Sequence, residues 1–175
     1  MFKKFAMLAV AGVVAAATPA FAIDQEGKWE VTLLGSGTSD KDFDNGGFAF
    51  TGTVGYYFND QFQVALRQGV TYSDVSGDDD VLQGATRVGA FYHFNYDETQ
   101  MLVPYVGLNI GYLYGDNIEE TFAAGPEVGL KYFVNDTTFI TGSVGYEFLF
   151  EDGDDADDAI EDGQLFYGLG IGFQF

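Results

Sequence analysis

Strict alternation between large apolar side chains and small or polar ones constrains this chain more than any other feature. The clearest example runs from residue 48 to residue 58, where alternate positions hold Phe48, Phe50, Gly52, Val54, Tyr56 and Phe58. A period of two is typical of a β-strand with two different faces. The pattern recurs clearly in 62–72, 102–114, 140–150 and 165–175, and less regularly near 28–36, 81–94 and 122–134. No stretch after residue 22 has a helical period, so the sequence predicts eight strands.

The connections between these segments fall into two kinds. Those at 59–61 and 135–137 are short turns, and the one near 95–100 is of modest length. The other four, at 37–46, 73–80, 115–121 and 151–163, are mostly longer and acidic. An even number of strands, with short turns at one end and long loops at the other, is typical of an outer-membrane barrel.

Alternation alone does not say which face is outside, because a soluble lipocalin-like barrel also has eight strands with an apolar face. Volume distinguishes the two. The interior of an eight-stranded barrel is only just wide enough for side chains to fill. The Phe, Tyr, Leu, Ile and Val residues of the apolar face would not fit inside it, whereas the Gly, Ser, Thr and Asn residues of the other face would. We therefore predict an all-β fold, an eight-stranded antiparallel transmembrane up-and-down β-barrel over residues 23–175.

Residues 1–22 have the features of a secretory signal peptide. Lys3 and Lys4 precede an uncharged stretch at 5–17, and the segment ends in Ala20, Phe21 and Ala22. A basic start, a short apolar run and a small-x-small ending are the signature of such a leader. A transmembrane helix would need about 20 apolar residues. We expect cleavage after residue 22 and a location in the cell outer membrane of a Gram-negative bacterium.

The last strand carries the most specific pattern. Its alternate residues are Tyr167, Leu169, Ile171, Phe173 and Phe175. With this ending, residues 23–175 resemble the small outer-membrane β-barrel family of OmpA/OmpX type. The resemblance implies that these five residues form the signal read by the outer-membrane assembly machinery. Nothing follows Phe175, so we expect the periplasmic wall-binding domain of the larger OmpA-like proteins to be absent.

Two prolines depart from an ideal strand pattern. Pro104 and Pro126 lie inside predicted strands, although proline cannot donate to the ladder of a closed barrel. We expect each to mark a bulge or a strand end.

The inward face holds three acidic and three basic residues: Glu30, Arg67, Arg87, Glu127, Lys131 and Glu147. Buried charges need partners, so these six predict a salt-bridge network that holds the barrel closed. The alternative is the charged constriction of a narrow channel. Inward glycines such as Gly89, Gly107 and Gly129 are expected to leave space that water could fill.

Catalytic and metal chemistry have little support. His93 is the only histidine, and its expected place is inward near the short turns, so no histidine is available as a general base near the opposite rim. The acidic connections could bind Ca²⁺ or Mg²⁺, but neither 73–80 nor 151–163 has the spacing of a calcium loop. We expect these charges to be solvated, and expect no cofactor and no enzymatic activity. A net charge of −20 excludes a broad basic surface for nucleic acid.

These features favour a monomeric barrel with a structural or surface-interaction role, a salt-bridged interior and acidic extracellular loops. Its expected partners are outer-membrane lipid, lipopolysaccharide and the assembly machinery. The alternative is a narrow porin-like channel for small solutes.

Overall fold

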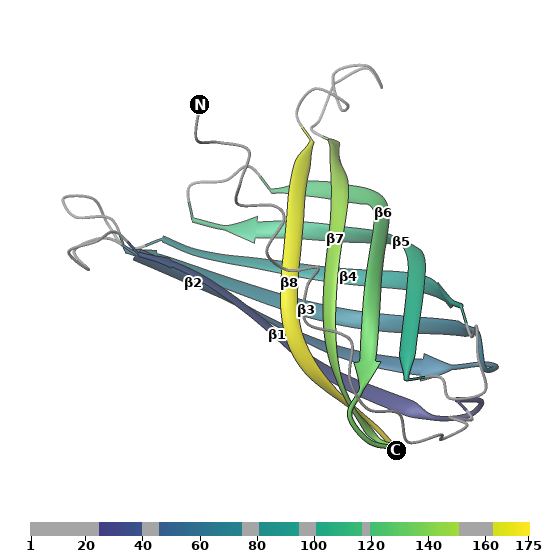
Figure 1. Ribbon diagram of the computed structural model, residues 1–175. Helices are drawn as coiled ribbons and strands as arrows, with labels where there is room; N and C mark the ends of the chain where they lie inside the picture. Colours follow the sequence, from purple (N-terminus) through teal and green to yellow (C-terminus); the bar gives the residue numbers. More distant parts are fainter. Residues whose placement is uncertain (1–24, 40–45, 75–80, 95–100, 117–119, 151–162) are drawn as a thin grey trace, which may run out of the picture.

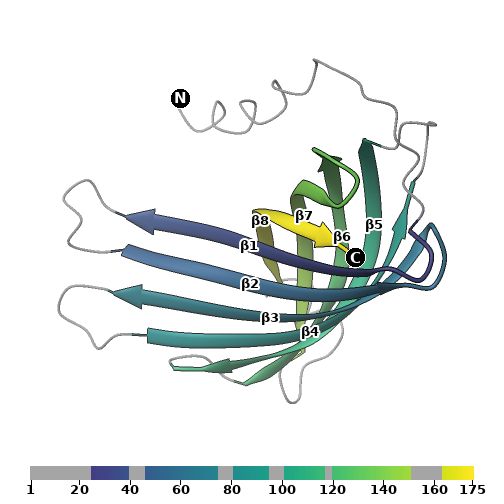
Figure 2. The same ribbon diagram turned by 90° about the horizontal axis from the view of Figure 1, so that it is seen from below.

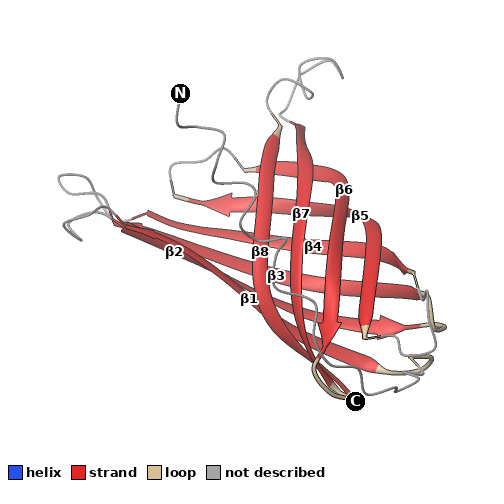
Figure 3. Ribbon diagram, viewed as in Figure 1, coloured by secondary structure: helices blue, strands red, loops and turns tan. Residues whose placement is uncertain are grey.

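The computed structural model describes residues 25–39, 46–74, 81–94, 101–116, 120–150 and 163–175. Their strands are β1 (Trp29–Ser39), β2 (Gly46–Tyr57), β3 (Phe62–Asp74), β4 (Val81–His93), β5 (Leu102–Gly115), β6 (Thr121–Phe133), β7 (Thr138–Phe150) and β8 (Gln164–Gln174). The predicted leader at 1–22 and most of the acidic connections lie outside the described residues. Strands account for nearly all of the described chain (Figure 3).

The eight strands form one closed barrel in sequence order, each antiparallel to the next, and β8 pairs with β1 (Figures 1 and 2). The predicted fold class is confirmed, and the predicted strand bounds agree with the observed ones to within three residues. Within the described ranges, no helix has the length and apolar character needed to cross a membrane.

The two ends of the barrel differ. At the end that we call the turn end, Asn59 accepts hydrogen bonds from the main-chain N–H groups of Gln61 and Phe62 through Oδ1, at 2.9 and 2.8 Å. Asn135 forms the same bonds with Thr137 and Thr138 in the β6–β7 turn, at 3.0 and 2.8 Å. Asparagine favours tight turns because its side chain bonds the backbone two residues ahead. The opposite end, where the four acidic connections attach, is the loop end.

The large apolar side chains lie on the outer face, as predicted. Leu108 and Tyr167, for example, are 67% and 71% exposed. Aromatic rings form contacts near both ends of this face, among them Trp29 with Tyr56 at the turn end and Tyr112 with Phe122 at the loop end, with centroid distances of 5.1 and 4.9 Å. An apolar band flanked by two aromatic girdles is the outer surface of a membrane barrel.

The two prolines behave differently. Pro104 is the third residue of β5 and pairs with Leu130 of β6, whereas the β4–β5 ladder ends beside it at the pair His93–Tyr105. It therefore marks the end of one ladder, close to the predicted strand end. The expectation for Pro126 is wrong, because this residue lies in the middle of β6 and the register with β7 is the same on both sides of it. The register pairs of β6 with β7 are interrupted at Gly125 and Pro126, where proline has no N–H to donate. The strand therefore accommodates the proline by losing local pairing and not by forming a bulge.

The expected space above the inward glycines is mostly filled. The ring of Phe91 covers Gly89 and Gly107, and the ring of Tyr105 covers Gly129. Phe166 and Phe139 cover Gly145 and Gly172 in the same way. Large inward rings thus lie against strands that carry no side chain at the facing position, and this packing explains how aromatic residues fit inside a narrow barrel.

Gly125 gives a test of this close strand packing. A Cβ atom at this position would overlap the main-chain carbonyl oxygen of Tyr146, whereas a Cβ at Gly52 on the outer face meets nothing within 4 Å. We expect Gly125→Ala to lower the free energy of unfolding by about 1–3 kcal/mol, because main-chain atoms have to move. Gly52→Ala is the matched control and should be neutral or slightly stabilising. Urea unfolding in lipid vesicles measures both, and equal effects would contradict the packing described.

Candidate functional site

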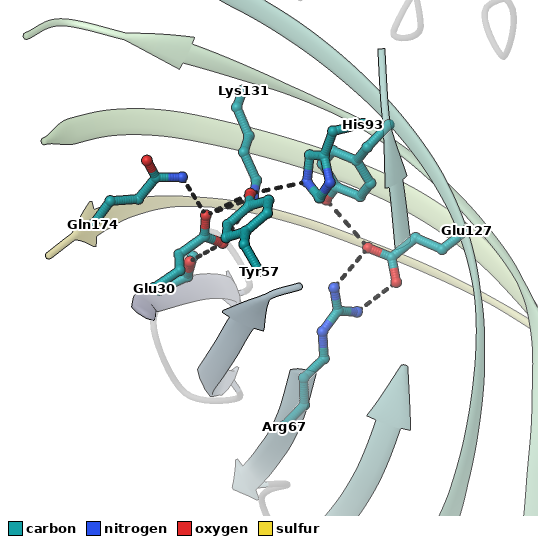
Figure 4. Close-up of polar contacts among 9 residues, drawn as sticks. Glu30, Tyr57, Arg67, His93, Glu127, Lys131 and Gln174 are labelled. Carbon is teal, nitrogen blue, oxygen red and sulfur yellow. Dashed lines mark hydrogen bonds and ion pairs between the residues drawn. The ribbon is translucent and has the colours of Figure 1, made fainter. Parts of the chain in front are cut away.

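The interior near the turn end is organised around Glu30 on β1 and Lys131 on β6. The Lys131 ammonium donates to both carboxylate oxygens of Glu30 at 2.7 Å and to the Tyr57 hydroxyl at 2.8 Å. Tyr57 in turn donates to the Glu30 carboxylate at 3.0 Å, and the Gln174 amide donates to the same carboxylate at 3.1 Å (Figure 4). The cluster therefore joins β1, β2, β6 and β8 in one network, and both charged side chains are almost fully buried.

His93 completes this cluster. Its Nε2 lies 3.2 Å from the Tyr57 hydroxyl oxygen, and its ring is fully buried. Because the Tyr57 proton is directed at Glu30, the contact fits a histidine that donates from Nε2. His93 lies inward at the turn end, where the sequence places it, and its contacts are those of a structural residue.

Aromatic and aliphatic side chains seal the turn end around the charges. Lys131 lies 5.3, 5.5 and 5.0 Å from the ring centroids of Tyr57, Tyr105 and Phe139, within the range of cation–π attraction. Val103, Phe133 and Phe139 form a buried apolar cluster beside it.

Two further ion pairs lie nearer the loop end. Arg67 on β3 forms a bidentate pair with Glu127 on β6, in which Nη2 lies 3.0 Å from Oε1, and Tyr105 donates to the same Glu127 oxygen at 3.2 Å (Figure 4). Arg87 on β4 pairs with Glu147 on β7 at 2.5 and 2.9 Å. Bidentate arginine–carboxylate pairs combine charge with fixed geometry and are among the stronger hydrogen-bonded pairs in proteins.

The strand register explains why these pairs cross the lumen. Arg67 and Arg87 are direct partners on β3 and β4, so two like charges lie side by side on one wall. Their carboxylate partners come from β6 and β7 on other parts of the wall. The two glutamates have side-chain exposures of 0%, whereas the arginines retain 12% and 14%. The guanidinium groups are therefore the part of each pair that borders open space.

All six inward charges that the sequence singles out are thus found in three one-to-one pairs. Sequence reasoning missed the uncharged residues that complete the hydrogen bonding, chiefly Tyr57, Tyr105, Gln164 and Gln174. The available signal was a large polar or aromatic residue on a face otherwise made of small ones. The five residues proposed as the assembly signal, Tyr167, Leu169, Ile171, Phe173 and Phe175, all lie exposed on the outer face at the end of the chain.

Two cavities of unequal size lie inside the barrel. The larger, which we call the vestibule, has a volume of about 370 Å³, and Arg67 and Arg87 line it together with loop-end residues such as Gln83 and Leu113. The smaller, of about 20 Å³, lies among Glu30, Lys131 and their neighbours and has room for about one water molecule. On the turn-end side of the vestibule, the buried Tyr57, Phe133 and Phe139 side chains fill the lumen, so the vestibule is a cup and the described residues leave no continuous aqueous path.

The described residues offer no metal site, since nowhere in these ranges do three His, Cys, Asp or Glu side chains come together to hold an ion. The acidic residues of 75–80 and 151–162, for which divalent cations were considered, lie outside the described residues.

A closed barrel of eight antiparallel strands with an apolar outer face and an ion-paired interior defines a transmembrane β-barrel of the small outer-membrane class. The sequence matches the family described as the outer membrane protein beta-barrel domain over residues 7–175, so the chain belongs to that family and lies in the outer membrane. No curated protein sequence gives a significant match.

Solved structures show the same fold. The N-terminal β-barrel domain of Pseudomonas aeruginosa OprF is 22% identical, with a TM-score of 0.62 over 87% of this chain and 99% of that one. Neisserial surface protein A is 15% identical, with a TM-score of 0.52 over 84% of this chain and 94% of that one.

The ion pairs predict a sharp contrast between interior and loop charges. Glu127→Ala leaves the buried Arg67 guanidinium without its partner, which typically costs about 3–5 kcal/mol, and Arg67→Ala has the converse effect. We expect either change to lower the urea midpoint of unfolding.

Joint replacement of Asp154, Asp155 and Asp157 by Asn is the comparison. From the sequence we expect these charges to be solvated, and solvated charges contribute little to stability. A triple variant more damaging than Glu127→Ala would contradict the assignment of inside and outside. A calcium-dependent loss in the triple variant would indicate a metal site in that connection.

Proposed function

We propose that this protein is a non-enzymatic barrel that supports the outer membrane of a Gram-negative bacterium and displays acidic loops at the cell surface. The observation that carries the proposal is the interior closed by three ion pairs. A barrel filled in this way is a rigid scaffold, and the parts free to differ in chemistry are the connections at the loop end.

Several features support the details of this proposal. Residues 1–22 would deliver the chain across the inner membrane, and the exposed aromatic residues of β8 would present it to the assembly machinery. The orientation common to such barrels puts short turns in the periplasm and long loops outside. The acidic connections would then face the medium and the phosphates of lipopolysaccharide, with divalent cations as exchangeable counter-ions and not as a fixed cofactor.

The absence of enzymatic activity is also part of the proposal. His93 is the sequence's one histidine, and it is buried at the turn end in contact with Tyr57. The acidic side chains that the vestibule approaches are committed to arginines. A hydrolytic site needs a general base within reach of its substrate, and among the described residues the glutamates nearest the vestibule are both paired with arginines.

The rival function, a narrow channel for small solutes, needs water to pass the turn end. There Lys131, Glu30 and Tyr57 fill the lumen together with the Phe133 and Phe139 rings.

Planar-bilayer recording of the purified protein distinguishes the two functions. We expect no steady single-channel steps from the unmodified chain, because the turn-end cluster blocks the lumen. Lys131→Ala should admit ions by opening that cluster, whereas Tyr132→Ala on the lipid side of the same strand should not. Reproducible steps from the unmodified protein that change on replacing Arg67 or Arg87 would establish the channel instead.

A further inference from the structure

The barrel closes between β1 and β8, and these two strands pair along only part of their length. β1 and β8 share six register pairs, from Glu30–Gln174 to Gly35–Leu169, whereas every other neighbouring pair of strands shares ten to twelve. Beyond Gly35 and Leu169, residues 36–39 of β1 pair with β2 alone, and residues 164–168 of β8 do not pair with β1. The two strands diverge towards the loop end (Figure 1).

The vestibule reaches this open part of the seam. On one side it is lined by Leu34, Gly35 and Ser36 of β1, and on the other by residues 164–168 of β8. Leu165 and Tyr167 belong to the outer face and are more than half exposed, yet they border the same cavity as the inward arginines. Because residues 36–39 and 164–168 do not pair with each other, the vestibule borders a gap in the barrel wall between β1 and β8.

An opening of this kind has a clear physical requirement. In the hydrocarbon region, main-chain N–H and C=O groups have to be hydrogen-bonded, and an open strand edge is tolerated only where it borders a cavity or is covered. The free edges of β1 and β8 satisfy this condition because the vestibule lies behind them. A molecule that occupies the vestibule would face these edges as well as the arginines.

The lining has two chemically different parts. At the floor, Arg67 uses its two Nη atoms for Glu127, and Arg87 uses Nε and Nη2 for Glu147. Each guanidinium has five N–H donors, so both arginines have donors left over. The Nε atom of Arg67 is buried without a hydrogen-bond partner, and both arginines line the vestibule, whereas their carboxylate partners do not. At the seam, the lining is apolar and comes chiefly from Leu34, Leu165, Phe166 and Tyr167.

We propose that the vestibule binds a single-chain amphiphile with an anionic head, which enters from the outer membrane through the β1–β8 seam. The head lies against Arg67 and Arg87, where charge-assisted hydrogen bonds are available. The chain leaves between Leu34 and the apolar residues of β8. A cavity of about 370 Å³ is within the range of pockets that hold small ligands.

Charge favours the lateral route over entry from water. The connection between β7 and β8 carries eight acidic residues and no basic one at 151–162, which repels an anion approaching from the loop end. A molecule arriving through the seam reaches the arginines from the membrane side. The site is independent of the scaffold role, since a barrel that binds nothing would still be a scaffold.

Fluorescence quenching tests the site directly, because the chain has one tryptophan, Trp29, at the turn end. In the variant Trp29→Phe, Phe166→Trp, the reporter faces the vestibule. The probe is dibromostearate added to vesicles at alkaline pH, with its uncharged methyl ester as the control for the head group. We expect saturable quenching by the acid and only weak, unsaturable quenching by the ester.

Four variants in the reporter background, two test changes and their two comparisons, locate the site. Ser36→Phe fills the vestibule at the seam and should weaken apparent binding at least tenfold, whereas Leu33→Phe on the lipid side of β1 should leave it unchanged. Arg87→Gln should weaken binding to a similar extent, and Arg87→Lys should restore part of it. Folding of each variant is checked by its altered gel mobility before boiling. Equal quenching by acid and ester, or binding unaffected by Ser36→Phe, would overturn the proposal.

Discussion

The pairing of charge across the lumen is the interaction on which the rest of this structure depends. A narrow barrel cannot hydrate six ionised groups, and an unpartnered one would cost several kcal/mol. Each cation therefore meets an anion from another strand, and the three pairs span the lumen at successive heights from Lys131–Glu30 at the turn end to Arg87–Glu147 near the loop end. Because each pair joins strands that are not neighbours, the pairs brace the barrel across its diameter as well as around its wall.

The distribution of side-chain size divides the interior into two halves. Tyr57, Phe91, Tyr105, Phe133 and Phe139 fill the turn-end half, and facing glycines make room for several of their rings. The loop-end half is lined by small residues such as Ala49, Thr51, Gly69 and Ala85, so it remains hollow. The barrel is thus filled at the turn end and hollow at the loop end, with Arg67 and Arg87 at the boundary between the two halves.

Much of this could be predicted from the sequence, for reasons that particular residues make clear. Alternation with a period of two assigns each residue to a face, so Arg67, Glu127 and the other inward charges follow from counting along a strand. Asn59 and Asn135 mark the tight turns by their chemistry. The pairing partners of these charges depend on the register around the whole barrel, which no local pattern contains.

Tyr57 and Tyr105 were missed as network members because alternation gives their face but not the atoms they reach. The expectation for Pro126 was wrong because a strand within a closed barrel can lose local pairing without changing register. The incomplete pairing of β1 with β8 involves strands at opposite ends of the chain, so no short segment of sequence predicts it.

A double-mutant cycle on Glu30 and Lys131 tests the central role of cross-lumen pairing most directly. The free energy of unfolding in vesicles would be measured for Glu30→Gln, Lys131→Met and the combined variant. If each charge is held by the other, both single changes are strongly destabilising, and the double variant loses less than their sum by at least about 1 kcal/mol, within the range of contacting residues. Additive losses, with a coupling energy near zero, would show that the buried charges are solvated independently and would contradict this account.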